Sequence, residues 1–396
     1  MGEPFCSALA RHASGYEQFL EGRGYARRSI EAHRRLMVDL GRWLAVGEVG
    51  LVIPSVSELE AFVAWRQATG RSRFTSVRGL RPLIEYLGMV LPPRPPEPET
   101  ALDRFVSSYR CYLVGERGLA ELTLVGYLET ARVFLEVSCS GDPERLGALG
   151  PAEVASFVVA ERARGLSPRT VNEVVVRLRS LLRVCYLKGL IDSPLSQATP
   201  WMANSRAGSL PRGLEVGVGA RLLASCDRST LVGARDFAIM TVLVRLGLRA
   251  GEVAALCLDD LDWHRGELVV RGKGECFEQL PLPVDVGQAL ADYLTYRGRA
   301  PAGRSVFSTV YAPLGPMSRT AVRAVVRQAC LRVGVPDCGT HRFRHHLATG
   351  LLADGASLPE IGQLLRHHHL QTTAIYATVD ANALAAVAGS WPGTNR

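Results

Sequence analysis

Lysine is nearly absent from this chain of 396 residues. Among its 46 basic residues only Lys188 and Lys273 are lysines, so 46 − 2 = 44 are arginines. Because arginine codons are rich in G and C, a GC-rich genome accounts for this skew, and the arginine count by itself says nothing about function. For the same reason, the two lysines that remain are candidates for positions that require lysine.

The sequence also lacks the motifs of several protein classes. Its nine cysteines are scattered and never spaced as C-x-x-C, which indicates neither a disulfide framework nor a zinc knuckle and favours a reducing cytoplasm. Neither a secretion signal within 1–25 nor a long uninterrupted apolar run is present, so we expect no export and no membrane span. A phosphate-binding G-x-x-x-x-G-K-[ST] motif is missing, which predicts chemistry without a nucleotide.

What is present is the composition of a soluble globular protein, with 47% hydrophobic, 21% charged and 7% aromatic residues. The length predicts two to three domains. The formal net charge of +8 divides into +2 over 1–100 (13 − 11), +1 over 101–200 (12 − 11) and +5 over 201–396 (21 − 16). Such a surplus is compatible with a polyanionic partner but does not identify one.

Two stretches punctuate the chain, the proline-rich run 91–100 and the Gly/Pro/Ser-rich run 198–219. They predict three domains at 1–90, 101–197 and 212–396. The first two resemble each other at an offset of 94 residues, which pairs Ser29 with Thr123 and His33 with Tyr127. Both read as small helical bundles, so the first is a possible duplicate of the second, although generic amphipathic helices also align this well by chance.

The third domain mixes element types. A helix is expected over 233–247, and two short strands over 267–271 and 277–282 flank the turn Gly272-Lys273-Gly274. Ser318 and the capping box Ser357-x-x-Glu360 predict further helix starts. The fold class is therefore mainly α with a small antiparallel β-sheet, as two N-terminal helical bundles followed by a larger C-terminal domain.

A helix that starts with Ser167 as cap and Pro168 as first residue carries a basic stretch. Its apolar stripe would pack inward, so the charges face solvent. They form either an ordinary solvated face or a surface that contacts DNA phosphates. The candidate DNA-binding residues are Arg162, Arg164, Arg169, Arg177, Arg179, Arg183 and Lys188.

Six of the nine histidines fall within 341–369 together with three arginines. A metal site is one interpretation, since imidazole binds zinc, copper and iron. No carboxylate directly neighbours any of these histidines in the chain, however, and the arginines would repel a cation. The alternative is an oxyanion site in which guanidiniums hold a phosphate and a histidine moves a proton.

At these residues the sequence resembles the tyrosine recombinases, also called phage integrases. The resemblance rests on four segments in order: Leu246-Gly-Leu-Arg249-Ala-Gly-Glu252, Arg271-Gly-Lys273-Gly274, His341-Arg-Phe-Arg344-His345, and Leu364-Leu-Arg-His367 followed by Thr372-Thr-Ala-Ile-Tyr376. Residues 101–197 resemble the family's helical core-binding domain, and 212–396 its catalytic domain. Residues 1–90 are outside the family's minimal pattern.

The resemblance implies a role for each matching residue. Tyr376 would attack a DNA phosphodiester and form a 3′-phosphotyrosyl link, while Arg249 and Arg344 hold the non-bridging oxygens. His341 would take the tyrosine proton, Lys273 would protonate the leaving 5′-oxygen, and His367 would donate to the phosphate. Glu252 would orient these groups, and His345 would support them from behind. No metal or other cofactor is implied.

Three positions depart from the family pattern. Arg366 stands where a small glycine is usual, His368-His369 replace small hydroxyl residues, and Glu278 stands where a basic residue is common. None of these departures removes a catalytic group. His346, His368 and His369 are expected to serve packing or the surface.

The resemblance implies a site-specific recombinase or integrase that cuts and rejoins double-stranded DNA in the cytoplasm, in DNA integration or transposition for a mobile element. A homotetramer on two DNA sites is implied, with accessory recombinase subunits as possible partners and no membrane partner. The alternatives are DNA relaxation like that of a type IB topoisomerase, a non-catalytic DNA-binding module, and a metal-dependent phosphodiesterase.

Overall fold

The computed structural model describes residues 9–46, 52–93, 99–203, 214–215, 217–272, 277–298 and 303–366. It contains two compact units, one within 95–208 and the other combining parts of 1–94 and 209–396. Each of the three segments that the sequence punctuation separates has a hydrophobic core of its own. The division into three domains itself stays a prediction.

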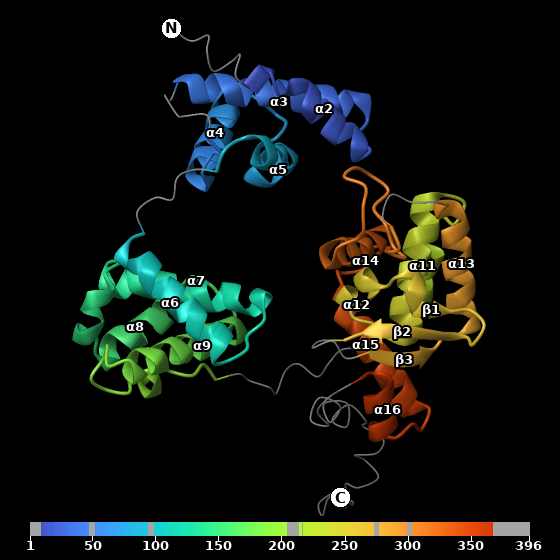
Figure 1. Cartoon of the computed structure of the whole chain (residues 1–396). Helices are drawn as coiled ribbons and strands as arrows, with labels where there is room; N and C mark the ends of the chain where they lie inside the picture. The colour runs from blue at the N-terminus through green and yellow to red at the C-terminus, as the bar shows by residue number, and fades with distance from the viewer. Residues whose placement is uncertain are drawn as a thin grey trace, which may run out of the picture. The chain divides into compact units, whose positions relative to one another are not determined.

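The described part of the first segment is a helical bundle (Figure 1). Its elements are α2 (Ala13–Gly22), α3 (Arg27–Val46), α4 (Val56–Ala68), the 3-10 helix η1 (Val77–Leu80) and α5 (Arg81–Val90). Ser55 begins α4 with a capping box, because its hydroxyl accepts from the Glu58 N–H and the Glu58 carboxylate accepts from the Ser55 N–H. Tyr16, Leu40 and Phe62 are fully buried in the core.

The second segment is also helical. Its elements are α6 (Ala101–Gly115), α7 (Glu121–Cys139), η2 (Pro143–Ala148), α8 (Pro151–Ala163), α9 (Pro168–Leu187) and η3 (Leu195–Ala198). The predicted cap of α9 is confirmed, since the Ser167 hydroxyl accepts from the Thr170 N–H. The predicted apolar stripe is confirmed as well, because its members are all buried: Val171, Val174, Val175, Leu178, Leu181 and Leu182.

The helices of these two segments follow the offset found in the sequence. Helix α3 begins at Arg27 and α7 at Glu121, which are 121 − 27 = 94 residues apart. Helices α4 and α8 both have 13 residues and begin 151 − 56 = 95 residues apart. These matches support a duplication, which stays a prediction.

The third segment combines helices with a three-stranded antiparallel sheet of order β1-β2-β3. Its elements are α10 (Val218–Ala224), α11 (Leu231–Leu246), α12 (Ala250–Ala255), η5 (Leu258–Asp260), β1 (Leu261–Asp262), β2 (Glu267–Arg271), β3 (Phe277–Pro281), α13 (Val284–Arg297), α14 (Arg319–Val333), α15 (Gly339–Ala353) and α16 (Leu358–Leu364). In the hairpin, Leu268 pairs with Leu280 and Arg271 with Phe277. The predicted mainly α fold with a small antiparallel sheet is confirmed.

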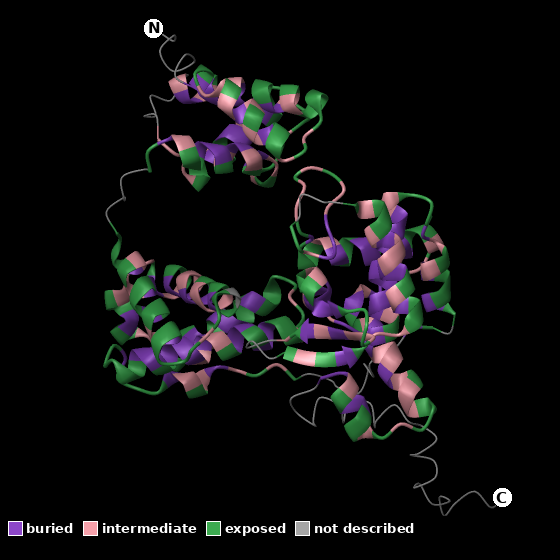
Figure 2. Ribbon diagram, turned by 45° about the vertical axis from the view of Figure 1, so that its right-hand side comes forward, coloured by how far each residue is buried: buried purple, intermediate pink, exposed green. Residues whose placement is uncertain are grey.

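Helix α11 is the centre of this third segment. It lies beside α13 and packs against α12, α14 and α15, and nearly its whole length is buried (Figure 2). It ends at Leu246 and is capped by Gly247, whose φ of 57° is a left-handed conformation that glycine adopts without strain. Because Arg249 follows two residues later, the most buried helix of this segment fixes the start of the candidate site.

The predicted helix caps of this segment are confirmed. The Ser318 hydroxyl accepts from the Ala321 N–H, and Ser357 and Glu360 form the expected capping box.

Within the described ranges, no helix is both long and apolar enough to cross a membrane.

Candidate active site

A cavity of about 540 Å³ lies where α12, the β2–β3 hairpin, α14, α15 and the end of α16 meet. Its lining is mostly charged: Arg249, Glu252, Arg271, Glu278, Arg319, Arg323, His341 and Arg366, with Ala250, Gly251, Gly272 and Thr340 between them. Five guanidiniums against two carboxylates give 5 − 2 = +3. Such a cavity attracts an anion with several oxygens.

Arg249 is held at the N-terminal end of α12 by Glu252. Its backbone N–H donates to Glu252 Oε2 at 2.8 Å, and its Nη1 donates to Glu252 Oε1 at 2.7 Å. The Glu252 side chain is 7% exposed, whereas that of Arg249 is 41% exposed. The carboxylate therefore aims the guanidinium from behind and leaves part of it facing the cavity.

Glu252 also binds a second arginine, Arg366. The Nη2 of Arg366 donates to Glu252 Oε2 at 2.7 Å, and its Nε lies 3.4 Å from Glu278 Oε2. The Arg366 side chain is 5% exposed, and this burial lowers its pKa from the usual value, against the opposing effect of the two carboxylates. Its φ of 55° is unusual for a residue with a side chain.

These contacts explain two departures from the family pattern together. The arginine at 366 and the acid at 278 face each other, so the charge that one introduces is balanced by the other. The sequence had marked both positions but had not joined them, and Arg366 was not among the expected site residues. The signal that could have found it is that the sequence has an arginine at 366, where glycine is usual, and also an acid at 278, where a basic residue is common.

Arg344 is buried beside the cavity rather than in its lining. Its Nη1 donates to the carbonyl oxygen of Gly247 at 3.1 Å, at the end of α11. A Cβ on Gly247 would lie 3.0 Å from Leu347 and 3.5 Å from the Arg344 Cα, so glycine permits this close approach of α15. Arg344 therefore contacts the end of α11 two residues before Arg249, the other predicted arginine.

The first turn of α15 brings His341 to the cavity, where it is exposed at the rim. His345 lies one turn further along α15 and is half-buried. Burial lowers the pKa of His345, and the neighbouring His341 and Arg344 lower it further. These effects favour the uncharged form of the His345 ring.

Lys273, His367 and Tyr376, together with His368 and His369, lie outside the described residues. The neighbours of the first two do line the cavity: Gly272 directly precedes Lys273, and Arg366 directly precedes His367. In the ranges that the structure describes, no group of three or more His, Cys, Asp or Glu side chains could hold a metal ion.

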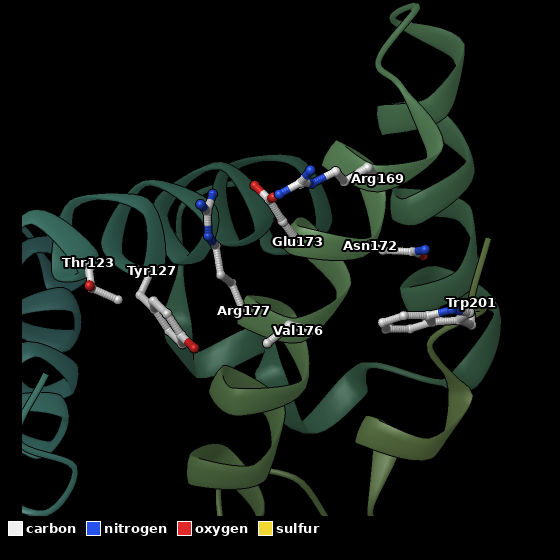
Figure 3. Close-up of a pocket in the computed structure, with 8 residues that line it drawn as sticks. All are labelled: Thr123, Tyr127, Arg169, Asn172, Glu173, Val176, Arg177 and Trp201. Atoms are coloured by element: carbon white, nitrogen blue, oxygen red, sulfur yellow. Dashed lines mark ion pairs between the residues drawn. The ribbon is translucent and has the colours of Figure 1, made fainter. Parts of the chain in front are cut away.

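The candidate DNA-binding residues have different local surroundings. Two of them, Arg169 and Arg177, line a cleft of about 570 Å³ between α7, α9 and the segment that follows η3 (Figure 3). The rest of that cleft consists of Thr123, Tyr127, Asn172, Glu173, Val176 and Trp201. Aromatic, aliphatic and guanidinium groups thus share one hollow, and Figure 3 shows Tyr127 and Arg177 reaching it from facing helices.

Of the other five candidate residues, four bond to nearby groups, and Arg183 does not line the cleft. Arg164 pairs with Glu161 at 2.8 Å, and Lys188 donates to the Ser108 hydroxyl at 2.8 Å. Arg179 donates to Thr199 and stacks over Trp201 with 5.5 Å between the guanidinium carbon and the ring centroid. Arg162 donates to the carbonyl oxygen of Leu166, and Arg183 is exposed further along α9.

Gly126 gives Arg177 its place in the cleft. A Cβ on Gly126 would lie 2.6 Å from the guanidinium carbon of Arg177, which is closer than real Cβ contacts allow. The guanidinium therefore rests directly on the backbone of α7, in space that any larger residue would fill.

Comparison with known proteins adds to this geometry. The phage integrase family model matches residues 216–383. A putative integrase/recombinase, y4rA of Sinorhizobium fredii (strain NBRC 101917 / NGR234), is 42% identical over 297 residues, which cover 74% of this chain and 72% of the relative. The tyrosine recombinase XerC of Brucella suis biovar 1 (strain 1330) is 32% identical, with 68% of this chain and 87% of the relative covered.

Solved structures share the fold. The site-specific recombinase XerH bound to a palindromic difH substrate matches with a TM-score of 0.58 at 19% identity, covering 84% of this chain and 94% of that one. A lambda integrase dimer bound to a core site matches with a TM-score of 0.56 at 17% identity, covering 69% and 94%. At these identities the likeness concerns the fold alone.

Proposed function

The chain belongs to the phage integrase family, the tyrosine recombinases, and from this premise we propose how its residues break and rejoin DNA. Tyr376 attacks a phosphodiester of duplex DNA and becomes linked to the 3′-phosphate, while a 5′-hydroxyl leaves. Arg249 and Arg344 bind the non-bridging oxygens, and His341 accepts the phenol proton. Lys273 protonates the leaving 5′-oxygen, and His367 donates a hydrogen bond to the phosphate.

The observation that carries this proposal is the charged cavity in which Arg249 and His341 meet. An excess of guanidinium over carboxylate charge suits a phosphodiester, because phosphoryl transfer depends mainly on positioning and on neutralising charge at the equatorial oxygens. Glu252 holds Arg249 by two hydrogen bonds and so restricts it to one geometry. His345, whose pKa is lowered by burial and by the neighbouring His341 and Arg344, lies one turn along the same helix and supports His341 in this role.

The covalent step accounts for rejoining without a nucleotide. The phosphotyrosyl diester replaces the phosphodiester that was cut, so attack by a 5′-hydroxyl restores DNA and releases Tyr376. A phenol with a pKa near 10 needs a base at neutral pH, and such help typically contributes about 10²–10⁴-fold. His341 at the cavity rim is the described residue that suits this task.

The remaining parts of the proposal concern substrate and assembly. Strand exchange at two DNA sites calls for four protomers, so we assign a homotetramer, with accessory recombinase subunits as further partners and a role in moving a mobile element. The activity takes place in the cytoplasm, where the DNA substrate lies. Arg169, Arg177, Thr123 and Tyr127 contact this DNA through the cleft of Figure 3, whereas Arg162, Arg164, Arg179, Arg183 and Lys188 supply weaker phosphate contacts around it.

Trapping on a nicked DNA substrate tests the nucleophile. The nick lets the short 5′-hydroxyl fragment diffuse away, so an active enzyme accumulates as a covalent complex visible on a denaturing gel. We expect Tyr376→Phe to abolish this complex and to bind DNA nearly as well as the unchanged chain.

The matched control is Tyr311→Phe, which removes the hydroxyl of a tyrosine that is 76% exposed and does not line the cavity. This variant should form the complex normally. A covalent complex that persists in Tyr376→Phe would refute the assignment of the nucleophile.

A further inference from the structure

Arg366 occupies a place in the fold that does not favour an arginine. Its φ of 55° lies in the left-handed region, which glycine adopts freely and residues with a side chain do not. The side chain is 5% exposed, and within the described ranges its Nη1 has no hydrogen-bond partner. A buried donor without a partner lowers stability. A residue that is kept under such strain points to a role other than packing.

The Glu252 carboxylate accepts hydrogen bonds from two arginines at once. Its Oε1 accepts from Nη1 of Arg249 at 2.7 Å. Its Oε2 accepts from the backbone N–H of Arg249 at 2.8 Å and from Nη2 of Arg366 at 2.7 Å. Both oxygens of this buried carboxylate are therefore occupied, and Arg366 takes one of the places on Oε2.

This arrangement leaves part of the Arg249 guanidinium unused. An arginine and a carboxylate frequently form two parallel hydrogen bonds, which occupy one side of the guanidinium. The Arg249 side chain makes a single bond to Glu252, through Nη1. Its Nε and Nη2 have no partner among the residues that the structure describes, and the side chain is 41% exposed in the lining of the cavity. These two donors are therefore available to a phosphate oxygen.

Arg366 also changes the charge behind Arg249. Arg249 and Glu252 alone would carry 1 − 1 = 0, whereas the two guanidiniums with this carboxylate carry 2 − 1 = +1. Burial lowers the pKa of Arg366 against the effect of its two carboxylates, and repulsion from Arg249 lowers it further. Glu278 is 34% exposed, so water screens its charge more than that of Glu252, which is 7% exposed. The positive charge of Arg249 is thus only partly neutralised.

We propose that Arg366 is a positioning residue for strand cleavage, which occupies Glu252 Oε2 and so keeps the free donors of Arg249 turned toward the phosphate. This role rests on the proposed function, in which Arg249 binds a non-bridging oxygen. Without Arg366, Oε2 would accept from Nη2 of Arg249, and the guanidinium would turn out of the cavity to form a two-bond pair with Glu252. Arg366 itself contacts no reacting atom in this role.

The variant Arg366→Met/Glu278→Gln tests this role without changing the net charge of the cavity. It removes one positive and one negative charge together, so that Glu278 is not left as an unpaired carboxylate, and Glu252 still has Arg249 as a partner. Methionine replaces the arginine with an unbranched apolar chain. The matched control is Arg228→Met/Asp292→Asn, which removes an ion pair of 2.8 Å near the opposite end of α11, where neither residue lines the cavity.

Two quantities are measured with the full chain. One is the rate at which the covalent complex forms on saturating nicked DNA, and the other is the Kd for the same duplex without the nick. We expect the test variant to form the complex about 10- to 100-fold more slowly, because a small misplacement of a group at the reacting phosphate has an effect of this size. The Kd should stay nearly unchanged, since the contact matters most in the transition state. The control should keep both quantities.

A second substrate separates positioning from a loss of structure. A methylphosphonate at the cleaved position replaces one charged non-bridging oxygen by a methyl group, so less charge is left for Arg249 to neutralise. On this substrate the difference in rate between the test variant and the unchanged chain should shrink severalfold. A site that is merely loosened would lose the same factor on both substrates.

The outcomes that contradict the proposal are specific. An unchanged rate in the test variant would overturn it, as would equal losses on the two phosphates or a loss confined to the Kd. Arg366→Lys, with Glu278 in place, keeps one charge and one donor for Oε2, so it should form the complex faster than the test variant. A lysine variant that is as slow as the test variant would also count against the proposal.

This experiment is separate from the test of the nucleophile. A covalent complex in Tyr376→Phe contradicts the proposed function, whereas equal losses on the two phosphates contradict only the role of Arg366.

Discussion

Replacing Arg366 by glycine tests whether this arginine stabilises the candidate site. The change restores the residue usual in the family and relieves the left-handed backbone, which is worth about 1 kcal/mol. It also removes the partner of Glu252, and breaking a buried ion pair costs about 3–5 kcal/mol. The second carboxylate, Glu278, is 34% exposed and can be rehydrated, so the net loss of local stability should be about 2–4 kcal/mol.

Hydrogen exchange is the suitable assay, because a chain with several cores does not unfold in one step. In Arg366→Gly, amides of α12 and α16 should exchange about 30- to 1,000-fold faster, while those of α3 and α9 stay unchanged. Adding Glu278→Gln should recover part of the protection, since one of two facing carboxylates is gone.

The matched control is Arg323→Ala. This arginine lines the same cavity from α14, is exposed and has no ion pair within the described residues, so its loss should change stability by less than about 0.5 kcal/mol. Protection of α12 that is the same in Arg366→Gly as in the unchanged chain would refute the reasoning.

Two further predictions concern the helical bundles. Burial lowers the pKa of His33 to about 4, so between about pH 6.5 and pH 4 the unfolded bundle binds a proton that the folded bundle does not. Its stability should therefore fall by about 3 kcal/mol as the pH drops through this window. His33→Phe should remove this dependence, measured in the full chain as urea-induced hydrogen exchange of the α3 amides. Equal pH dependence in His33→Phe would count against it. Gly126→Ala should push the Arg177 guanidinium out of its place, which removes about one charged contact and weakens binding to DNA by about 1.5–3 kcal/mol in a titration. The control Gly115→Ala, with open space around it, should bind normally.

Local signals in the sequence predicted much of the fold. The caps at Ser167, Ser318 and Ser357 depend on side chains that lie within three residues of the amides they bind, so their pattern is visible in the sequence. The predicted strands agree with β2 and β3 to within one residue. Strand β1 was missed, because two residues are too few to show an alternating pattern.

The candidate site was predictable where a residue's role follows from its neighbours in the chain. The Arg249–Glu252 pair is such a case, with its members three residues apart. The Arg366–Glu252 bond was not predictable, because it joins residues 114 positions apart and depends on how α16 packs. Whether the basic stretch around α9 contacts DNA stays a prediction, since charge counts do not say which arginines already bond to nearby groups.

The attachment of Arg249 to Glu252 and of Arg344 to the Gly247 carbonyl has a thermodynamic consequence. Ordering a long side chain costs conformational entropy, and here folding has already met that cost for both guanidiniums. The binding energy of a phosphate at this place is therefore available for chemistry and is not used to assemble the two arginines. The two attachments are separate: loosening of the end of α11 would release Arg344 from the Gly247 carbonyl, while Glu252 of α12 still holds Arg249.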